Sequence, residues 1–511
     1  MFVKCYAGAI VGIKAVKVDV EVNVAGGGLG LFLVGLPDNA VKESEQRIRS
    51  AFENSQRRMT AKKVVVNLAP ADLRKEGSGF DLPIAVGILA ATQQVLDTRL
   101  ADTMFVGELS LDGAVKPVRG ILPLAVMAKE SGLRRIVVSS ASAHEAAVVD
   151  GIEVIPVANL AEVIAYLNNE IEITPAIGEV SAEAEQQSLY AEDFADVKGQ
   201  RDVKRALEIA AAGGHNVLMI GAPGSGKTML ARRIPTIMPP MSLDEAVEAT
   251  KIHSVAGKLG ETVGLMTKRP FRAPHHLTSQ VALIGGGQSP QPGEVSLAHN
   301  GVLFLDELPE FGRNVLEVLR QPLEDRMITI SRAKYSVEYP SNFTLIGAMN
   351  PCPCGFYNHP TKECTCQPFA INRYFSRISG PLLDRIDMHI EVVPVPLSEI
   401  NGEQVEESSA EIRKRVIAAR EIQSRRFAGT SIHSNAMMNS AMLRTFCPLS
   451  REVRALLESA MSRLNLSARA YDRIIKVART IADLAGSDNI EASHIAEAIN
   501  YRTLDRDSWG K

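Results

Sequence analysis

The sequence has little cysteine, no long apolar run and no large excess of charge of either sign. Its 511 residues include only six cysteines, and four of these lie within 352–366, which does not suggest a disulfide framework. The longest apolar runs, such as 82–91, are too short to cross a bilayer, so we expect no membrane helix and no membrane partner. The start of the chain lacks the pattern of an export signal, and we expect a cytoplasmic protein.

The charge balance argues against a protein that is basic over its whole surface. Lysine and arginine number 56 and aspartate and glutamate 59, which gives a formal net charge of -3. Contact with nucleic acid would therefore have to come from particular loops. With 46% hydrophobic and 23% charged residues, the chain has enough apolar material for ordinary cores.

Changes in composition divide the chain into an α/β multidomain protein. Residues 171–195 are rich in glutamate, contain no lysine or arginine and predict an acidic linker. Before it, in 1–170, β-branched runs alternate with helical stretches and predict a compact α/β domain. Residues 196–400 alternate apolar strands with helices, which is typical of a doubly wound parallel sheet. In 401–511 apolar residues recur at helical spacing and predict a helical domain.

The clearest motif is a glycine-rich turn between an apolar strand at 216–220 and a helical segment at 229–234. The backbone N–H groups of such a turn point at phosphate oxygens, Lys227 can reach the β and γ phosphates, and Thr228 can hold magnesium. The motif predicts a site for ATP and Mg²⁺ formed by Gly221, Ala222, Pro223, Gly224, Ser225, Gly226, Lys227 and Thr228.

Polar side chains follow the next two predicted strands, 302–305 and 343–348. Asp306 is suited to binding the metal and Glu307 to polarising the attacking water. Asn350 could orient that water or sense the γ-phosphate, although an ordinary turn asparagine is the alternative. Together with the phosphate loop, these residues predict an ATP hydrolase.

Taken in order along the chain, these motifs resemble the AAA+ ATPases, in particular the branch with magnesium-chelatase ATPase subunits and MCM helicases. The resemblance rests on the phosphate loop, the acidic strand, Asn350, the Leu-Leu-Asp-Arg-Ile-Asp motif at 382–387 and a helical lid. With residues 271–276, 292–294 and 296–299 and the four-cysteine patch, it extends from the N-terminus to about Arg502. Over this length the chain is similar to the ComM/YifB family of magnesium-chelatase-like proteins.

The resemblance implies a hexameric ring in which Arg385 is the arginine finger that acts on a neighbour's nucleotide. Arg469 would be the second sensor, reaching the nucleotide from the lid, and Arg473 is a neighbouring candidate. From the residues alone, Arg385 could instead pair with Asp384 or Asp387 at the surface.

The function that the resemblance implies is that of an ATP-dependent DNA helicase or translocase. It would promote branch migration in homologous recombination and integrate incoming DNA in natural transformation, with recombination proteins among its expected partners. The alternatives are a chelatase-type remodeller of a partner protein, a regulatory protease, and a DNA scaffold without motor activity.

The domain at 1–170 resembles the proteolytic domain of Lon proteases, which use a serine activated by a lysine. Aligned on 75–77, the serine position falls at Gly79, and the lysine region reads as the apolar segment 121–124. We therefore expect a scaffold or DNA-facing domain without peptidase activity. Ser78 paired with another lysine is the alternative.

Two insertions could contact DNA. The first, about 255–298, carries several cations and the glycine run 285–287. The second, 327–339, alternates on either side of Arg332-Ala333-Lys334 and predicts a β-hairpin with a basic tip. Hairpins at these places line the pore in related ring helicases, so Arg332 and Lys334 would bind the phosphates of single-stranded or branched DNA. A solvated surface hairpin is the alternative, and its two tyrosines, Tyr335 and Tyr339, could stack on bases or pack.

The four-cysteine patch at 352–366 lies between Asn350 and Arg385. Two CxC pairs separated by nine residues can close a tetrahedral site. The pattern predicts a structural Zn²⁺ that folds a loop too short for a core of its own, held by Cys352, Cys354, Cys364 and Cys366. His359 in place of one thiolate, an iron–sulfur cluster and free cysteines are the alternatives.

Overall fold

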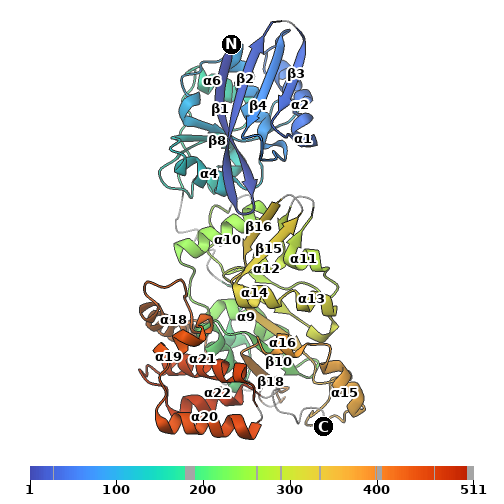
Figure 1. Ribbon diagram of the computed structural model, residues 1–511, viewed down its shortest axis with the longest axis vertical. Helices are drawn as coiled ribbons and strands as arrows, with labels where there is room; N and C mark the ends of the chain where they lie inside the picture. The colour runs from blue at the N-terminus through green and yellow to red at the C-terminus, as the bar shows by residue number, and fades with distance from the viewer. Residues whose placement is uncertain are drawn as a thin grey trace. The chain divides into compact units, whose positions relative to one another are not determined.

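The computed structural model describes most of the chain, with the helices and strands labelled in Figure 1. The residues that it describes are 1–26, 28–178, 190–260, 263–287, 290–332, 335–396, 399, 406–464 and 466–502. Contacts divide the chain into an N-terminal unit, Met1–Gln186 with Ala246–Met266, and a nucleotide unit, Gln187–Glu245 with Thr267–Lys511. Among the described residues, no helix combines the length and apolarity that a bilayer crossing requires.

The N-terminal unit is built on a mixed sheet in the order β3-β4-β2-β1-β5-β8-β9. Strand β2 runs antiparallel to β1 and β4, and the other neighbours in the sheet are parallel. Burial alternates along β1, as expected for a strand with one face on the core. The strands are β1 (Phe2–Val11), β2 (Lys14–Ala25), β3 (Gly30–Val34), β4 (Lys63–Ala69), β5 (Thr103–Phe105), β8 (Arg135–Ser139) and β9 (Glu153–Val157).

Helices α2 (Ser44–Asn54), α3 (Asp81–Ala91), α4 (Ile121–Glu130) and α6 (Leu160–Leu167) complete the core of this unit. Every residue of α3 is buried, which explains the apolar run at 82–91 as a core helix. Residues 246–266 group with this unit. The domain boundary predicted at 196 from the sequence would instead assign them to the ATPase domain. A hydrogen bond from Ser254 to the Glu145 carboxylate fastens them to the N-terminal unit.

The nucleotide unit contains a parallel sheet in the order β11-β14-β17-β10-β18. The three strands expected from the sequence are confirmed as β10 (Val217–Gly221), β14 (Val302–Leu305) and β17 (Thr344–Met349), and all three are buried along their length. Two edge strands were not predicted from the sequence: β11 (Phe271–Arg272), which has only two residues, and β18 (Met388–Val392) at the opposite edge.

Two hairpins emerge from the nucleotide unit. Helix α11 (Gln280–Ile284) leads into the short pair β12 (Gly285–Gly286) and β13 (Gln291–Pro292). The predicted hairpin is confirmed as β15 (Met327–Arg332) and β16 (Tyr335–Pro340), in which Arg332 is opposite Tyr335. Lys334, at its tip, lies outside the described residues, as does the side chain of Arg332.

The C-terminal part of the nucleotide unit is helical (red in Figure 1). Ser408 and Ser467 cap its two longest helices by accepting backbone N–H groups. One apolar core joins these helices to the sheet and to α8 (Arg201–Gly213). The helices are α18 (Ser409–Arg426), α19 (Ser440–Phe446), α20 (Arg451–Leu464), α21 (Ala468–Leu484) and α22 (Ala492–Asn500).

Candidate nucleotide site and cysteine cluster

The phosphate loop joins the end of β10 at Gly221 to α9 (Lys227–Ile237). Gly224 and Gly226 have φ angles of 80° and 91°, in the left-handed region that glycine adopts without strain. This curl and the first turn of α9 present backbone N–H groups that can bind an anion.

Lys227 folds back over the loop. Its Nζ donates to the carbonyls of Gly221 at 2.7 Å and Ala222 at 3.0 Å, and to Asn350 Oδ1 at 3.3 Å. Burial lowers the pKa of Lys227, and the nearby charges of Asp306 and Glu307 oppose this shift. The ammonium is therefore poorly solvated, and phosphate oxygens are stronger acceptors than the carbonyls that it now contacts.

Asp306 and Thr228 meet at the ends of β14 and the phosphate loop. Thr228 Oγ1 donates to Asp306 Oδ2 at 2.7 Å, and the backbone N–H of Glu307 donates to Asp306 Oδ1 at 2.9 Å. Hydroxyl and carboxylate oxygens are the ligands that Mg²⁺ prefers. The structure thus brings the two predicted magnesium ligands together.

Glu307 is 56% exposed and has a left-handed backbone, with φ 51°. Its Oε2 lies 3.3 Å from His276 Nδ1. This contact was not predicted from the sequence, where segment 271–276 carries part of the family resemblance and His276 has no role in hydrolysis. The two consecutive histidines at 275–276 soon after a strand were the available signal.

Asn350 follows β17, which lies between β14 and β10 in the sheet. Its contact with Lys227 places its side-chain amide at the phosphate loop, which is more than an ordinary turn asparagine would show. Two buried polar atoms near the loop, Ser225 Oγ and Gln200 Oε1, have no hydrogen-bond partner among the described residues. Unsatisfied polar atoms of this kind fit a loop that is completed by a ligand.

Arg385 has neither of the partners considered for it from the sequence. It donates to the Glu324 carboxylate and, through Nη1, to Pro381 O at 2.8 Å. The two acids flanking it pair with arginines of α21 instead: Asp384 with Arg469 at 2.9 Å and Asp387 with Arg473 at 2.7 Å.

Asp387 is fully buried, and desolvation alone would raise its pKa, but Arg473 and His215 outweigh this and lower the pKa. Arg473 therefore has a structural role, because its departure would leave the buried charge of Asp387 without this partner. Arg469 is 66% exposed and contacts Asp384, next to Arg385. Its assignment as the second sensor stays a prediction.

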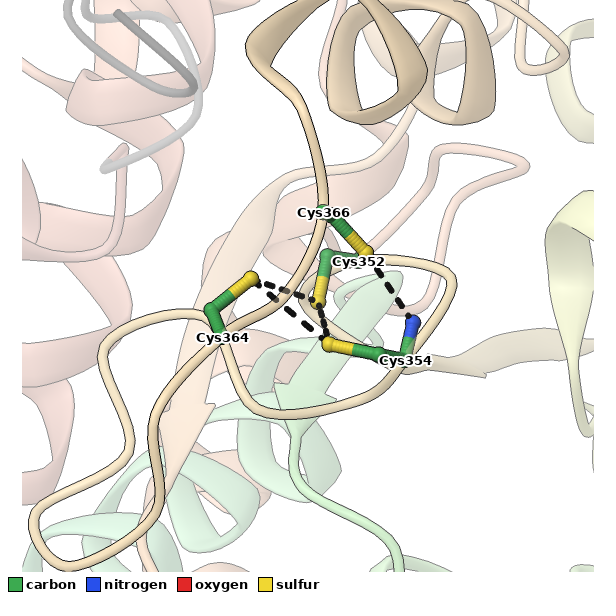
Figure 2. A group of neighbouring side chains, drawn as sticks. All are labelled: Cys352, Cys354, Cys364 and Cys366. Atoms are coloured by element: carbon green, nitrogen blue, oxygen red, sulfur yellow. Dashed lines mark hydrogen bonds between the residues drawn. The ribbon is translucent and has the colours of Figure 1, made fainter.

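The four cysteines converge on one point, as Figure 2 shows. Their sulfur atoms all lie within 4.8 Å of one another, and Cys352 Sγ is 3.3 Å from Cys354 Sγ and 3.7 Å from Cys364 Sγ. Sulfur atoms bound to one tetrahedral Zn²⁺ lie about 3.8 Å apart, given Zn–S bonds of about 2.3 Å. The donor set therefore fits zinc.

Backbone donors around the cluster also favour thiolates. The N–H of Tyr357 donates to Cys352 Sγ at 3.3 Å and that of Cys354 to Cys366 Sγ at 3.4 Å. His359 Nδ1 instead accepts the N–H groups of Thr361 and Lys362, each at 3.1 Å. This occupies one of the two nitrogens through which His359 could replace a thiolate.

The cysteine loop packs directly against the phosphate loop. Gly355 has φ 85°, and a Cβ at this position would lie 2.6 Å from Pro223 Cδ. Only glycine allows this approach. Cys352 is also only two residues beyond Asn350, so the cluster fixes the segment that carries Asn350.

In the described part of the N-terminal unit, Ser78 and Lys75 have separate partners. Ser78 donates to the Glu108 carboxylate, and the fully buried Lys75 donates to Pro70 O. Segment 121–124 lies in α4 with all its residues buried. The pairing of Ser78 with a lysine, kept open by the sequence, is thus not found among the described contacts.

Several side chains of the insertions have structural partners. Arg269 is buried and pairs with Glu245 at 2.9 Å, and Arg272 pairs with Glu294 at 2.6 Å. Of the two alternatives for Tyr339, the structure supports packing, because this side chain is fully buried and donates to Pro290 O at 2.7 Å.

Comparisons with known proteins cover nearly the whole chain. Three family models match: Subunit ChlI of Mg-chelatase over 20–142, Magnesium chelatase, subunit ChlI over 193–400, and its C-terminal model over 406–502. Competence protein ComM of Haemophilus influenzae is 45% identical over 98% of this chain and 97% of its own. Uncharacterized protein YifB of Escherichia coli is 45% identical over 98% and 96%. Lon protease 2 of Bacillus subtilis is 32% identical over 31% of this chain and 33% of its own.

Proposed function

The chain belongs to the ComM/YifB family of magnesium-chelatase-like proteins, and from this premise we propose that it is an ATP-driven DNA helicase or translocase that works as a homo-hexameric ring. The observation that carries the proposal is the meeting of Lys227, Thr228, Asp306 and Asn350 at the ends of three adjacent parallel strands. Such an edge is where α/β sheets bind ligands, and the family implies ATP and Mg²⁺.

Each residue of this site has a distinct task in hydrolysis. When bound, Mg-ATP supplies the phosphoanhydride bond that is cleaved. The phosphate-loop N–H groups and Lys227 bind the phosphates, while Thr228 and Asp306 hold the metal. Glu307 orients and deprotonates the attacking water, and Asn350 positions it against the γ-phosphate.

In the proposed ring, Arg385 acts on the nucleotide of the next subunit. A cation supplied in trans stabilises charge that develops on the transferred phosphoryl group. Head-to-tail contacts between identical subunits can close into a ring, and the family implies that this ring is a hexamer. Arg469, on the helical lid, would contribute as the second sensor.

The proposed substrate along which the ring moves is single-stranded or branched DNA. The hairpin β15–β16 is confirmed, and Arg332 and Lys334, which the sequence predicts at its tip, would bind phosphates independently of base sequence. A near full-length relative is named a competence protein. This supports branch migration during recombination, with integration of incoming DNA in natural transformation and recombination proteins as partners.

Two further parts complete the proposal. The four cysteines hold a structural Zn²⁺ that stiffens the loop behind Asn350 and the phosphate loop. The N-terminal unit is a Lon-like domain without peptidase activity, because Ser78 contacts a glutamate and the segment 121–124 is apolar and buried.

The test is strand displacement by the purified full-length protein on forked and three-stranded DNA. We expect displacement with hydrolysable ATP and none with a non-hydrolysable analogue or with the Glu307→Gln variant. An Arg385→Ala variant that turns over ATP and displaces strands at the wild-type rate would contradict the ring mechanism.

A second candidate is a chelatase-type remodeller, and the three magnesium-chelatase family models favour it. In that case a partner protein would bind the ring, and ATP turnover would not respond to DNA. Turnover measured with and without forked DNA separates the two functions.

A further inference from the structure

An open hollow of about 450 Å³ lies on the surface of the nucleotide unit beside Arg385. It is lined mainly by α14 (Arg320–Asp325) and the start of β15, and its charged residues include Glu317, Arg320, Glu324, Asp325 and Arg385. Of these charged residues, only Arg385 has a role in the proposed function.

Arg385 is the less accessible member of its ion pair. Its side chain is 15% exposed, while that of Glu324 is 65% exposed. Its Nε is buried without a partner among the described residues, and its two terminal nitrogens donate to Glu324 and Pro381. In this conformation the guanidinium is committed to its own subunit.

Glu324 is connected to the basic hairpin by a very short piece of chain. Only Asp325 and Arg326 separate it from Met327, where β15 begins. Arg326 closes the base of the hairpin, because its Nη1 donates to Phe343 O at 2.8 Å and its carbonyl accepts from Ser341 N at 2.9 Å, both just after β16. The start of β15 also lines the same hollow as Glu324, through Ile328 and Thr329, so a displacement of the hairpin would be transmitted to the end of α14 and to Glu324.

From these contacts we propose that Glu324 is a positioning residue that holds Arg385 back until DNA displaces the β15–β16 hairpin. Released, Arg385 extends to the nucleotide of the neighbouring subunit. The carboxylate of Glu324 is 65% exposed, so solvent screens the ion pair and a modest movement suffices to break it. The inference rests on the proposed function, because it assumes that Arg385 acts in trans and that the hairpin contacts DNA.

The decisive variant is Glu324→Gln, which keeps the shape of the side chain and removes its charge. We expect ATP turnover without DNA to rise about two- to fivefold. A fivefold rise corresponds to the loss of an ion pair worth about 1 kcal/mol. Stimulation by forked DNA should fall by a similar factor. Glu324→Asp keeps the charge and should stay closer to the wild type.

Glu317→Gln is the matched control. Glu317 lines the same hollow and pairs with Arg320 at 2.9 Å, so its loss alters the local charge equally without freeing Arg385. We expect this variant to keep both the DNA-free rate and the DNA stimulation. An equal rise in both variants would overturn the inference, since charge in the hollow and not the Glu324 contact would then be responsible.

A double variant separates this inference from the proposed function. In an Arg385→Ala background, Glu324→Gln should change nothing, because the arginine that it releases is absent. If Arg385→Ala lowers turnover but Glu324→Gln leaves the DNA-free rate unchanged, the inference is wrong and the ring mechanism survives. If Arg385→Ala itself has no effect, both the ring mechanism and the inference are wrong.

Discussion

The N-terminal unit and the nucleotide unit each place a lysine and a hydroxyl side chain beside a glycine turn. In the first, the fully buried Lys75 donates to Pro70 O and Ser78 donates to Glu108. In the second, Lys227 reaches Asn350 and Thr228 reaches Asp306. Similar residue types thus give a set of separate contacts in one unit and a convergent site in the other.

Topology accounts for the difference. Strands β10, β14 and β17 are parallel neighbours, so the residues that follow them meet at one edge of the sheet. In the N-terminal unit the glycine turn precedes the core helix α3, and its lysine contributes to packing. Chemistry therefore depends on which strand ends come together, and substitutions in the two units should have unequal effects.

Glu307→Gln should give the largest effect on ATP turnover. The amide cannot accept the proton of the attacking water, while the phosphate loop and the metal ligands remain. We expect a loss of about 10²-fold or more with ATP binding retained, measured by steady-state turnover and by equilibrium nucleotide binding. Ser78→Ala is the matched change in the N-terminal unit and should leave turnover unchanged. Equal losses in the two variants would abolish the distinction between the units.

Asn350→Ala should have the next largest effect. It removes the amide that contacts Lys227 and is proposed to orient the water, while the base Glu307 stays in place. We expect turnover to fall about tenfold, less than the removal of a preorganised donor costs in other active sites. Asn342→Ala, at the start of the same strand region, is the control. A wild-type rate for Asn350→Ala would make this residue an ordinary turn asparagine.

Much of this site could be predicted because its signals are local. The phosphate loop, Asp306 and Glu307 directly follow apolar strands, and the confirmed hairpin shows its alternation within a short segment. The four cysteines were within fifteen residues of sequence, so their convergence required only a turn.

The contacts between distant segments could not be predicted. Glu324 and Arg385 are 61 residues apart, and the sequence offered nearer acids, Asp384 and Asp387, as partners for Arg385. Those acids pair with α21, which reaches them only in the folded unit. Strand β11 is too short to show periodicity, and the contact of His276 with Glu307 depends on the loop that follows it.

Cys364→Ser should have a smaller effect on turnover and a large effect on metal content. Loss of one thiolate weakens a four-coordinate site, so bound zinc should fall from about one ion per chain toward zero. Because the cysteine loop packs on Pro223, we also expect a few-fold lower turnover. Metal analysis with Cys447→Ala as the control tests this, since Cys447 is buried far from the cluster in sequence. Equal zinc in both variants would contradict the assignment.

Lys75→Met should leave ATP turnover unchanged and alter only stability. Burial lowers the pKa of Lys75 from its ordinary 10.5. Between the lowered pKa and 10.5 the unfolded chain binds more protons than the folded chain, so the free energy of unfolding rises with pH across that window. The methionine variant lacks this contribution. Thermal unfolding of both proteins between about pH 7 and 10 should show the wild type gaining stability relative to Lys75→Met as the pH rises. A difference in stability between the two proteins that does not change with pH would mean that Lys75 has the same pKa in the folded and unfolded states. A loss of turnover in the variant would instead mean that Lys75 contributes to ATP hydrolysis.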